Sequence, residues 1–160
     1  MSAISFDAVI STPLPGSWRV GFGLQAGRLS TLDFLPPRTP LVASGRPEVQ
    51  RIAELLTDYF QDPHTTLRRI PLAPARTPFQ ARVRELMSAI PVGQTRSYGE
   101  LAGQLRTASR AVAGACRANP VALVVPCHRV VSVSGPGGFM GAVDGPPLEL
   151  KAWLLKHESV

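Results

Sequence analysis

Two adjacent residues, Cys127 and His128, carry the side chains in this sequence that are best suited to nucleophilic chemistry. They lie in the stretch VVPCHRVV at residues 124–131, where Pro126 precedes the thiol and Arg129 follows the imidazole. A nearby basic group favours the thiolate, which is the nucleophilic form of cysteine. Because neighbouring side chains of an extended segment point in opposite directions, a bridging water could carry the proton to His128, with a carboxylate orienting the imidazole. Such a thiol could serve a hydrolase, a redox sensor or an acceptor of alkyl groups.

The second cysteine, Cys116, lies among alanines on a predicted helix, and we interpret it as a small apolar residue. Two cysteines are too few for a disulfide framework or for a zinc site built from cysteines alone, so we expect free thiols, no metal and no cofactor. No apolar run approaches the roughly 20 residues that a membrane span needs, and the N-terminus lacks the pattern of a signal peptide. We therefore expect a cytoplasmic protein without a membrane contact.

The chain divides by charge. Residues 1–75 hold seven Arg against six acidic residues, whereas residues 76–160 hold eight Arg and two Lys against five acidic residues. The net excess is therefore +1 in the first part and +5 in the second, which sums to the net charge of +6. A basic second half is typical of a polyanion partner, most commonly nucleic acid, although charge alone favours a plain solvated surface.

The first 75 residues predict a mixed α/β lobe. The runs SWRVGFGL and LSTLDFL alternate apolar with smaller or polar residues, and QAGR between them supplies a turn, so a β-hairpin with one buried face is expected. The run PEVQRIAELLTDYF has helical apolar spacing and ends at QDP. We interpret the proline- and arginine-rich stretch RRIPLAPAR as an extended connector and place the lobe boundary between residues 75 and 76.

Residues 76–160 predict a mostly helical lobe, which makes the fold class α/β (α+β). Thr77 and Gln80 form a capping box before the apolar stripe of TPFQARVRELMSAIP, and Ser97 with Glu100 forms another before YGELAGQL. A third helix within TASRAVAGACRAN makes a helix-turn-helix or an ordinary helical hairpin. We expect the apolar run VALVV, residues 121–125, to be a buried strand that leads into the cysteine.

The third helix has features of a DNA-binding element. Small residues such as Ala111 would let its backbone approach a sugar-phosphate surface, while Arg110 and Arg117 supply positive charge. Small residues also permit close packing inside a core, so this composition alone leaves both interpretations open. Asn119 and Pro120 end the helix, because the position before proline disfavours helical geometry and Asn can bond its own turn.

Four motifs in this order resemble a known family. RAVAGACRANP, VVPCHRVV, GGFMG and WLLKHE, together with IPVGQTRSYGELA, are similar in order and spacing to the O6-alkylguanine-DNA alkyltransferases, which repair alkylated guanine directly. The resemblance covers about residues 77–158, while residues 1–75 fit the family's variable N-terminal lobe only in general pattern. It implies a suicidal methyltransferase that acts once on duplex DNA, as a monomer.

The resemblance assigns the chemistry to five residues. Cys127 would accept the alkyl group as a thioether, which no ordinary cellular reductant reverses, so each molecule would act once. His128 would deprotonate the thiol through water, and Glu158 would orient His128. Tyr98 would stack on or hydrogen-bond the damaged nucleotide and help to rotate its phosphate or protonate the leaving guanine. Asn119 would be the hinge that links the recognition helix to the cysteine segment.

The resemblance also implies the DNA and base contacts. The helix-turn-helix would lie in the minor groove, and Arg110 would enter the base stack in place of the flipped nucleotide. The further DNA contacts that we expect are Ala111, Arg117, Tyr98 and Arg129. The base pocket is expected to be lined by Phe139, Met140 and Gly141, and Pro126 and Val130 are expected to line it or its supporting core.

Phe139 and Met140 depart from the family's usual tyrosine followed by serine or glycine, and VDGPP extends the loop after them. Three alternatives remain beside alkyl transfer. A non-catalytic alkylguanine-binding damage sensor would lack the acceptor cysteine, which is present here. A DNA-binding module using only the helix-turn-helix would not need the intact set of motifs up to Glu158. A cysteine hydrolase would need an oxyanion site, which the sequence does not display.

Overall fold

The computed structural model describes residues 5–159 and separates into two compact units, the first ending at Ala73 and the second beginning at Pro74. The first unit holds a small antiparallel sheet and one long helix, and the second holds four helices. This mixture confirms the predicted α/β class, with the sheet in the first unit and the helices concentrated in the second.

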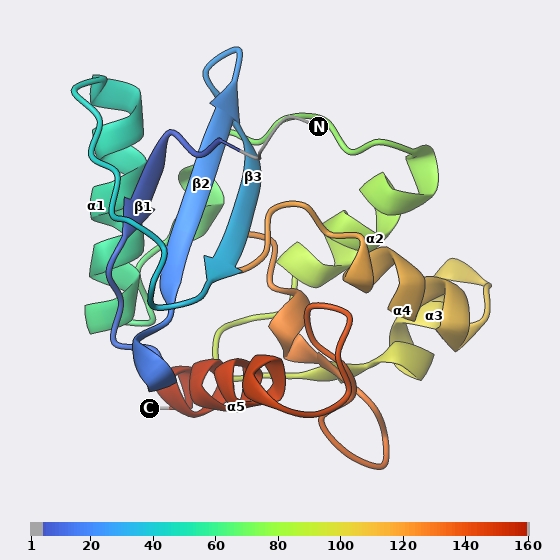
Figure 1. Cartoon of the computed structure of the whole chain (residues 1–160). Helices are drawn as coiled ribbons and strands as arrows, with labels where there is room; N and C mark the ends of the chain where they lie inside the picture. The colour runs from blue at the N-terminus through green and yellow to red at the C-terminus, as the bar shows by residue number, and fades with distance from the viewer. Residues whose placement is uncertain (1–4, 160) are drawn as a thin grey trace. The chain divides into compact units, whose positions relative to one another are not determined.

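The sheet of the first unit has three strands, β1 (Ala8–Ile10), β2 (Arg19–Gln25) and β3 (Arg28–Leu35), in the order β1-β2-β3 (Figure 1). The predicted hairpin is confirmed, because β2 and β3 pair in antiparallel fashion from Arg19↔Leu35 to Gln25↔Arg28. Its turn residues Ala26 and Gly27 both have positive φ, 52° and 76°. Two positive φ angles are typical of the two-residue turn whose twist matches that of the paired strands.

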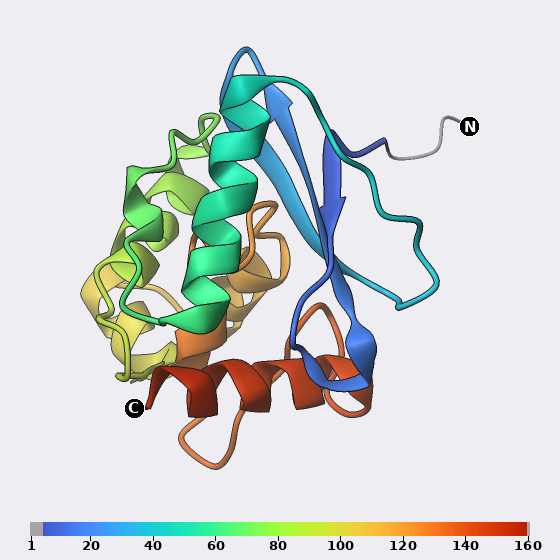
Figure 2. The same cartoon turned by 90° about the vertical axis from the view of Figure 1, so that its left-hand side faces the viewer.

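Helix α1 (Pro47–Gln61) lies along the sheet of the same unit (Figure 2). Its predicted helical spacing is confirmed, since the residues at that spacing are buried; they are Val49, Ile52, Leu56, Tyr59 and Phe60. Two short 3-10 helices, η1 (Pro15–Ser17) and η2 (Leu67–Arg69), complete the unit. The alternating apolar residues of β2 and β3 supply the rest of its core: Val20, Phe22, Leu29, Leu32 and Phe34.

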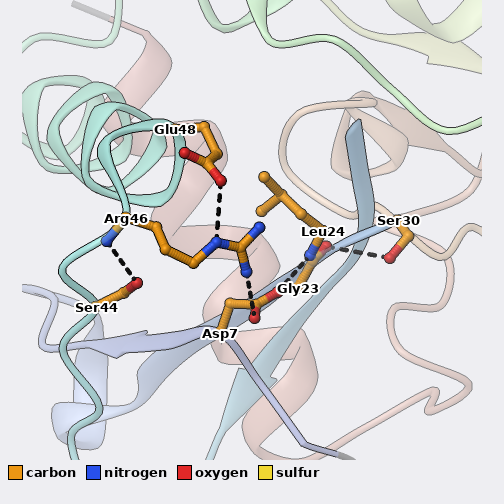
Figure 3. A network of polar contacts seen from close by, with 7 residues as sticks. All are labelled: Asp7, Gly23, Leu24, Ser30, Ser44, Arg46 and Glu48. Atoms are coloured by element: carbon orange, nitrogen blue, oxygen red, sulfur yellow. Dashed lines mark hydrogen bonds and ion pairs between the residues drawn. The ribbon is translucent and has the colours of Figure 1, made fainter. Parts of the chain in front are cut away.

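A polar network joins the beginning of the chain's described part to α1 (Figure 3). The guanidinium of Arg46 pairs with Asp7 at 3.2 Å and with Glu48 at 2.9 Å. Asp7 also accepts a hydrogen bond from the backbone N–H of Leu24 at 2.7 Å. Because the ion pairs are largely solvent-exposed, each contributes little to stability.

The second unit is built from α2 (Pro78–Ser88), α3 (Tyr98–Leu105), α4 (Ser109–Arg117) and α5 (Pro146–Glu158). Two predicted helix caps are confirmed: the Thr77 hydroxyl accepts from the N–H of Gln80 and the Ser97 hydroxyl from the N–H of Glu100, both at 3.0 Å. Helices α3 and α4 are joined by residues 106–108, as a helix-turn-helix requires. A two-residue parallel pair, β4 (Arg96–Ser97) with β5 (Val130–Val131), connects the start of α3 to the segment after the cysteine.

The predicted strand at residues 121–125 is wrong. These residues are buried but form a tight turn, in which the N–H of Val125 donates to the carbonyl of Val121 at 3.0 Å and Leu123 has a φ of 72°. A segment that is buried on all sides is apolar whether its backbone is extended or turned, so the apolar run did not identify a strand. In residues 5–159, no helix has both the length and the apolar composition of a membrane span.

Candidate active site

A cavity of about 140 Å³ in the second unit has Cys127 in its wall. Its other walls come from the first residue of α3, the C-terminal half of α4 and the loop before α5. The lining residues are Tyr98, Ala113, Cys116, Arg117, Cys127, Gly138, Phe139, Met140, Gly141, Ala142 and Val143. The lining is mostly apolar around two thiols, one phenol and one guanidinium, so the cavity suits a largely apolar group with a few polar atoms.

Cys127 opens a short 3-10 helix, η3 (Cys127–Arg129), rather than ending an extended strand. Only 8% of the residue is exposed, and this burial raises the pKa of its thiol. A hydrogen bond from the Asn119 side chain and the positive charge of Lys151 oppose that rise. The expectation that basic neighbours favour the thiolate is therefore corrected: Cys127 rests as a thiol and needs a base to become nucleophilic.

His128 lies against Glu158, with 2.9 Å between its Nε2 and the carboxylate Oε2. Both residues are buried, and burial lowers the pKa of His128, so the imidazole is neutral. A carboxylate accepts hydrogen bonds, so Nε2 carries the ring proton and Nδ1 carries the lone pair. Among the described residues Nδ1 has no hydrogen-bond partner. The ring nitrogen that can take up a proton is therefore unoccupied by protein groups.

Arg129 is placed differently from the prediction that it contacts DNA. Its guanidinium is buried and donates to Glu158 through Nε at 2.8 Å and Nη2 at 2.9 Å, and to the carbonyl of Ile90 through Nη1 at 2.7 Å. A buried guanidinium with three internal hydrogen bonds is poorly placed to hold a phosphate at the surface. We therefore correct the assignment: Arg129 is an internal partner of Glu158 and not a DNA contact.

Lys151 is a site residue that the sequence analysis missed. The residue is 0% exposed, and its ammonium donates to the carbonyls of Val130 at 2.8 Å and Gly138 at 3.0 Å. It lies over the ring of Tyr98, 5.9 Å from the centroid. Burial lowers the pKa of Lys151, and its positive charge in turn lowers the pKa of Cys127. A lysine on a helix is usually solvated, so its sequence context carried no sign of this position.

Asn119 connects the end of α4 to the turn that precedes the cysteine. Its Nδ2 donates to the carbonyl of Val125 at 2.9 Å, and its Oδ1 accepts from the N–H of Val121 at 3.2 Å. The backbone N–H of Cys127 donates to the same Val125 carbonyl at 2.8 Å. One side chain thus holds both ends of the buried turn on which Cys127 is mounted.

Tyr98 is the first residue of α3 and lines the cavity. Desolvation, the largest cause, raises the pKa of its phenol to about 12, so the hydroxyl keeps its proton at neutral pH. The ring passes close to Gly137, where a Cβ would lie 2.8 Å from Tyr98 Cε2. Gly137 also has a φ of 75°, so a residue with a side chain would be both strained and in collision with the phenol.

The other predicted residues fall into three groups. Arg110 and Ala111 are exposed in the first turn of α4, and Arg117 is exposed at its end and also lines the cavity. Phe139, Met140 and Gly141 line the cavity as expected of base-pocket residues. Pro126 and Val130 are buried but are not among the lining residues, and Val130 instead pairs with Arg96 in β4. This burial fits the expected alternative that the two residues belong to the core that supports the pocket.

Comparison with known proteins places this geometry in a family. The DNA-binding domain of 6-O-methylguanine DNA methyltransferase matches residues 78–160. The methylated-DNA–protein-cysteine methyltransferase of Salmonella typhimurium is 42% identical over 110 residues, which cover 67% of this chain and 61% of that protein. Its counterpart from Methanosarcina acetivorans is 44% identical over 91 residues, 56% of each protein. The chain thus spans less than two thirds of the length of these relatives.

Solved structures extend the likeness beyond the matched domain. The OGT protein of Mycobacterium tuberculosis in complex with DNA is 31% identical, with a TM-score of 0.77 over 94% of this chain and 91% of that one. The O6-methylguanine-DNA methyltransferase of Pyrococcus kodakaraensis is 28% identical, with a TM-score of 0.62 over 95% and 98%. With its second unit matched from Pro78 onward, the chain belongs to the 6-O-methylguanine DNA methyltransferase family.

Proposed function

We propose that this protein repairs DNA directly by transferring an alkyl group from O6 of guanine in duplex DNA to the sulfur of Cys127, once per molecule. The observation that carries the proposal is a buried thiol in a cavity wall, next to a neutral imidazole that a carboxylate orients. The names of the relatives, methylated-DNA–protein-cysteine methyltransferases, support the same reaction.

The first step is removal of the thiol proton. Since the pKa of Cys127 is raised by burial, the resting thiol requires a base, and Nδ1 of His128 is the acceptor with no protein partner. A water molecule would carry the proton between them, while Nε2 keeps its own proton on the bond to Glu158. The imidazolium that forms is stabilised by the carboxylate, and Asn119 and Lys151 lower the cost of the thiolate.

The second step is a displacement at the alkyl carbon. The sulfur lone pair forms the new carbon–sulfur bond while the bond from that carbon to guanine O6 breaks, and its electron pair stays on the guanine. The leaving base needs a proton, and the phenol of Tyr98, whose pKa is about 12, is the protonated donor in the cavity wall. Tyr98 becomes a phenolate when it donates, and the proton held by the His128 imidazolium restores the phenol. Overall the thiol proton is passed to guanine, and the protein ends as a thioether with neutral His128 and Tyr98.

The DNA partner is proposed from the exposed start of α4. Arg110 and Ala111 lie there on the surface, and a guanine inside the duplex cannot reach a buried sulfur without leaving the stack. We infer that α4 lies in the minor groove and that Arg110 fills the space of the flipped nucleotide. Both cysteines are free, which fits a reducing compartment, and we propose the cytoplasm.

The test is the mass of the intact protein before and after mixing with a duplex that contains O6-methylguanine. We expect a gain of one methyl group per molecule, located on Cys127. The Cys127→Ser variant is expected to bind the duplex and gain nothing, whereas Cys116→Ser is a matched control that keeps full transfer. Repeated turnover by one molecule, or a methyl group on Cys116, would contradict the proposal. Binding without any transfer would instead identify a damage sensor.

A further inference from the structure

We propose that Arg129 is a positioning residue of the reaction, which acts through Glu158 by holding its carboxylate in the orientation and charge state that His128 requires. The inference rests on the proposed function. It gives a role in alkyl transfer to a residue that contacts neither the cavity nor the surface on which DNA is proposed to bind, because Arg129 is buried and is not among the cavity-lining residues.

The geometry of the pair fixes the plane of the carboxylate. Nε of Arg129 donates to Oε1 of Glu158 at 2.8 Å while Nη2 donates to Oε2 at 2.9 Å, so both oxygens are held by one rigid fork. Nη1 donates to the carbonyl of Ile90 at 2.7 Å, which ties the fork to the segment that follows α2. Glu158 can therefore rotate only if the guanidinium moves as well.

His128 uses one of the two oxygens that Arg129 holds. Oε2 lies 2.9 Å from Nη2 of Arg129 and 2.9 Å from Nε2 of His128, so it accepts from both. The imidazole thus takes its orientation from an atom whose place the guanidinium determines. Cys127, His128 and Arg129 are consecutive residues of η3, so the thiol, the base and this fork move as one element.

The second contribution of Arg129 is charge. Glu158 is 2% exposed, and a buried carboxylate without a cation would take up a proton, because burial disfavours its charged form. A protonated Glu158 would donate to Nε2 of His128, and the ring proton would then have to lie on Nδ1. In that tautomer Nδ1 cannot accept the proton of Cys127. The cation therefore keeps His128 competent as a base.

Arg129 and His128 both pair with Glu158, but Arg129 is permanently charged, whereas His128 carries charge only when protonated. The charge of Lys151 in α5 also acts on the imidazole, and the ammonium of Lys151 is bonded to the carbonyls of Val130 and Gly138. The loop after α2 comes close to the end of α5 at Gly93, where a Cβ would lie 3.0 Å from the Glu158 carbonyl oxygen. Arg129 pairs with Glu158 at 2.8 Å between Nε and Oε1, which supplies the charge that the buried carboxylate needs.

The experiment is a double-mutant cycle on the single-turnover rate of methyl transfer, with the variants Arg129→Met, Glu158→Gln and both together. If Arg129 acts through Glu158, the double variant should be no slower than Glu158→Gln, and Arg129→Met alone should lose roughly 10- to 100-fold, as for other residues that orient a functional histidine. Arg129→Lys supplies charge without the fork, so its rate should lie between those of the wild type and Arg129→Met.

A direct readout is the tautomer of His128, followed by the 15N chemical shifts of its ring in histidine-labelled protein. The wild type is expected to carry the proton on Nε2, and Arg129→Met to shift it toward Nδ1, while Arg129→Lys retains more of the Nε2 form. Additive losses in the cycle, together with an unchanged tautomer, would overturn the inference. If Arg129→Met does not fold, the transfer rate and the His128 tautomer are measured in Arg129→Lys instead. A wild-type rate and a wild-type tautomer in Arg129→Lys would overturn the inference.

The two proposals fail in different ways. Absence of methyl transfer by the wild type would refute the proposed function, and the tautomer measurement would still test the role of Arg129. Normal transfer by the wild type with unchanged rate and tautomer in the Arg129 variants would refute this inference alone.

Discussion

Replacing Asn119 with alanine should destabilise the second unit by an amount that can be worked out from two hydrogen bonds. Loss of Nδ2 leaves the carbonyl of Val125 with its bond from the N–H of Cys127, so this part costs about 0.5–1.5 kcal/mol. Loss of Oδ1 leaves the N–H of Val121, in a residue that is 1% exposed, without the acceptor that the structure gives it. An orphaned buried donor costs about 1–3 kcal/mol, and the two parts together give a loss of about 1.5–4.5 kcal/mol.

The assay is urea unfolding followed by far-UV circular dichroism, with the free energy of unfolding compared at equal slope. Arg117→Ala is the matched control, because this exposed residue lies two positions earlier and should change stability by less than about 0.5 kcal/mol. Asn119→Ala should also slow alkylation of Cys127 by iodoacetamide at neutral pH, since the Asn119 hydrogen bond lowers the thiol pKa. If Asn119→Ala loses no more stability than Arg117→Ala and its alkylation rate is unchanged, the role of Asn119 as a hinge is refuted.

Three further outcomes are expected. Arg110→Ala should slow methyl transfer from duplex DNA by roughly tenfold or more and leave the reaction with free O6-methylguanine unchanged, because a free base needs no flipping. Equal losses on both substrates would exclude a role of Arg110 in base flipping. The free energy of unfolding should fall as the pH is lowered below 6.5, the ordinary pKa of a histidine. Burial lowers the pKa of His128 in the native state, so between the native and the ordinary pKa the unfolded chain binds more protons than the folded one. Each pH unit between these two pKa values removes about 1.4 kcal/mol of stability. Urea titrations from pH 7.5 to 5 measure this slope, and a His128→Gln variant with an equally steep slope would count against it. Gly137→Ala should displace Tyr98 and slow methyl transfer, whereas Gly103→Ala, where a Cβ meets nothing within 4 Å, should not; equal transfer rates would show that the loop adapts.

Local features were predictable from the sequence because they depend on neighbouring residues. The hairpin of β2 and β3 follows from period-two alternation around a short turn. Helices α2 and α3 begin directly after Thr77 and Ser97, because these hydroxyls satisfy backbone donors three residues later. The order of the motifs around Cys127 and Glu158 indicated the family before any contact was known. The buried turn at residues 121–125 was missed, because an apolar run carries no period that separates a strand from a turn.

By itself, the sequence determined which chemistry was available: one thiol and one imidazole side by side, a distant carboxylate and a basic second half. Only the tertiary structure decided how those groups are used. Arg129 is 29 residues from Glu158 in the chain, and Lys151 is 21 residues from Val130, so no local pattern could assign their partners. A cationic side chain is usually solvated, and it enters a core only where folding brings acceptors to it. The same burial raises the pKa of Cys127 and lowers that of His128, which makes a proton acceptor a requirement of the site.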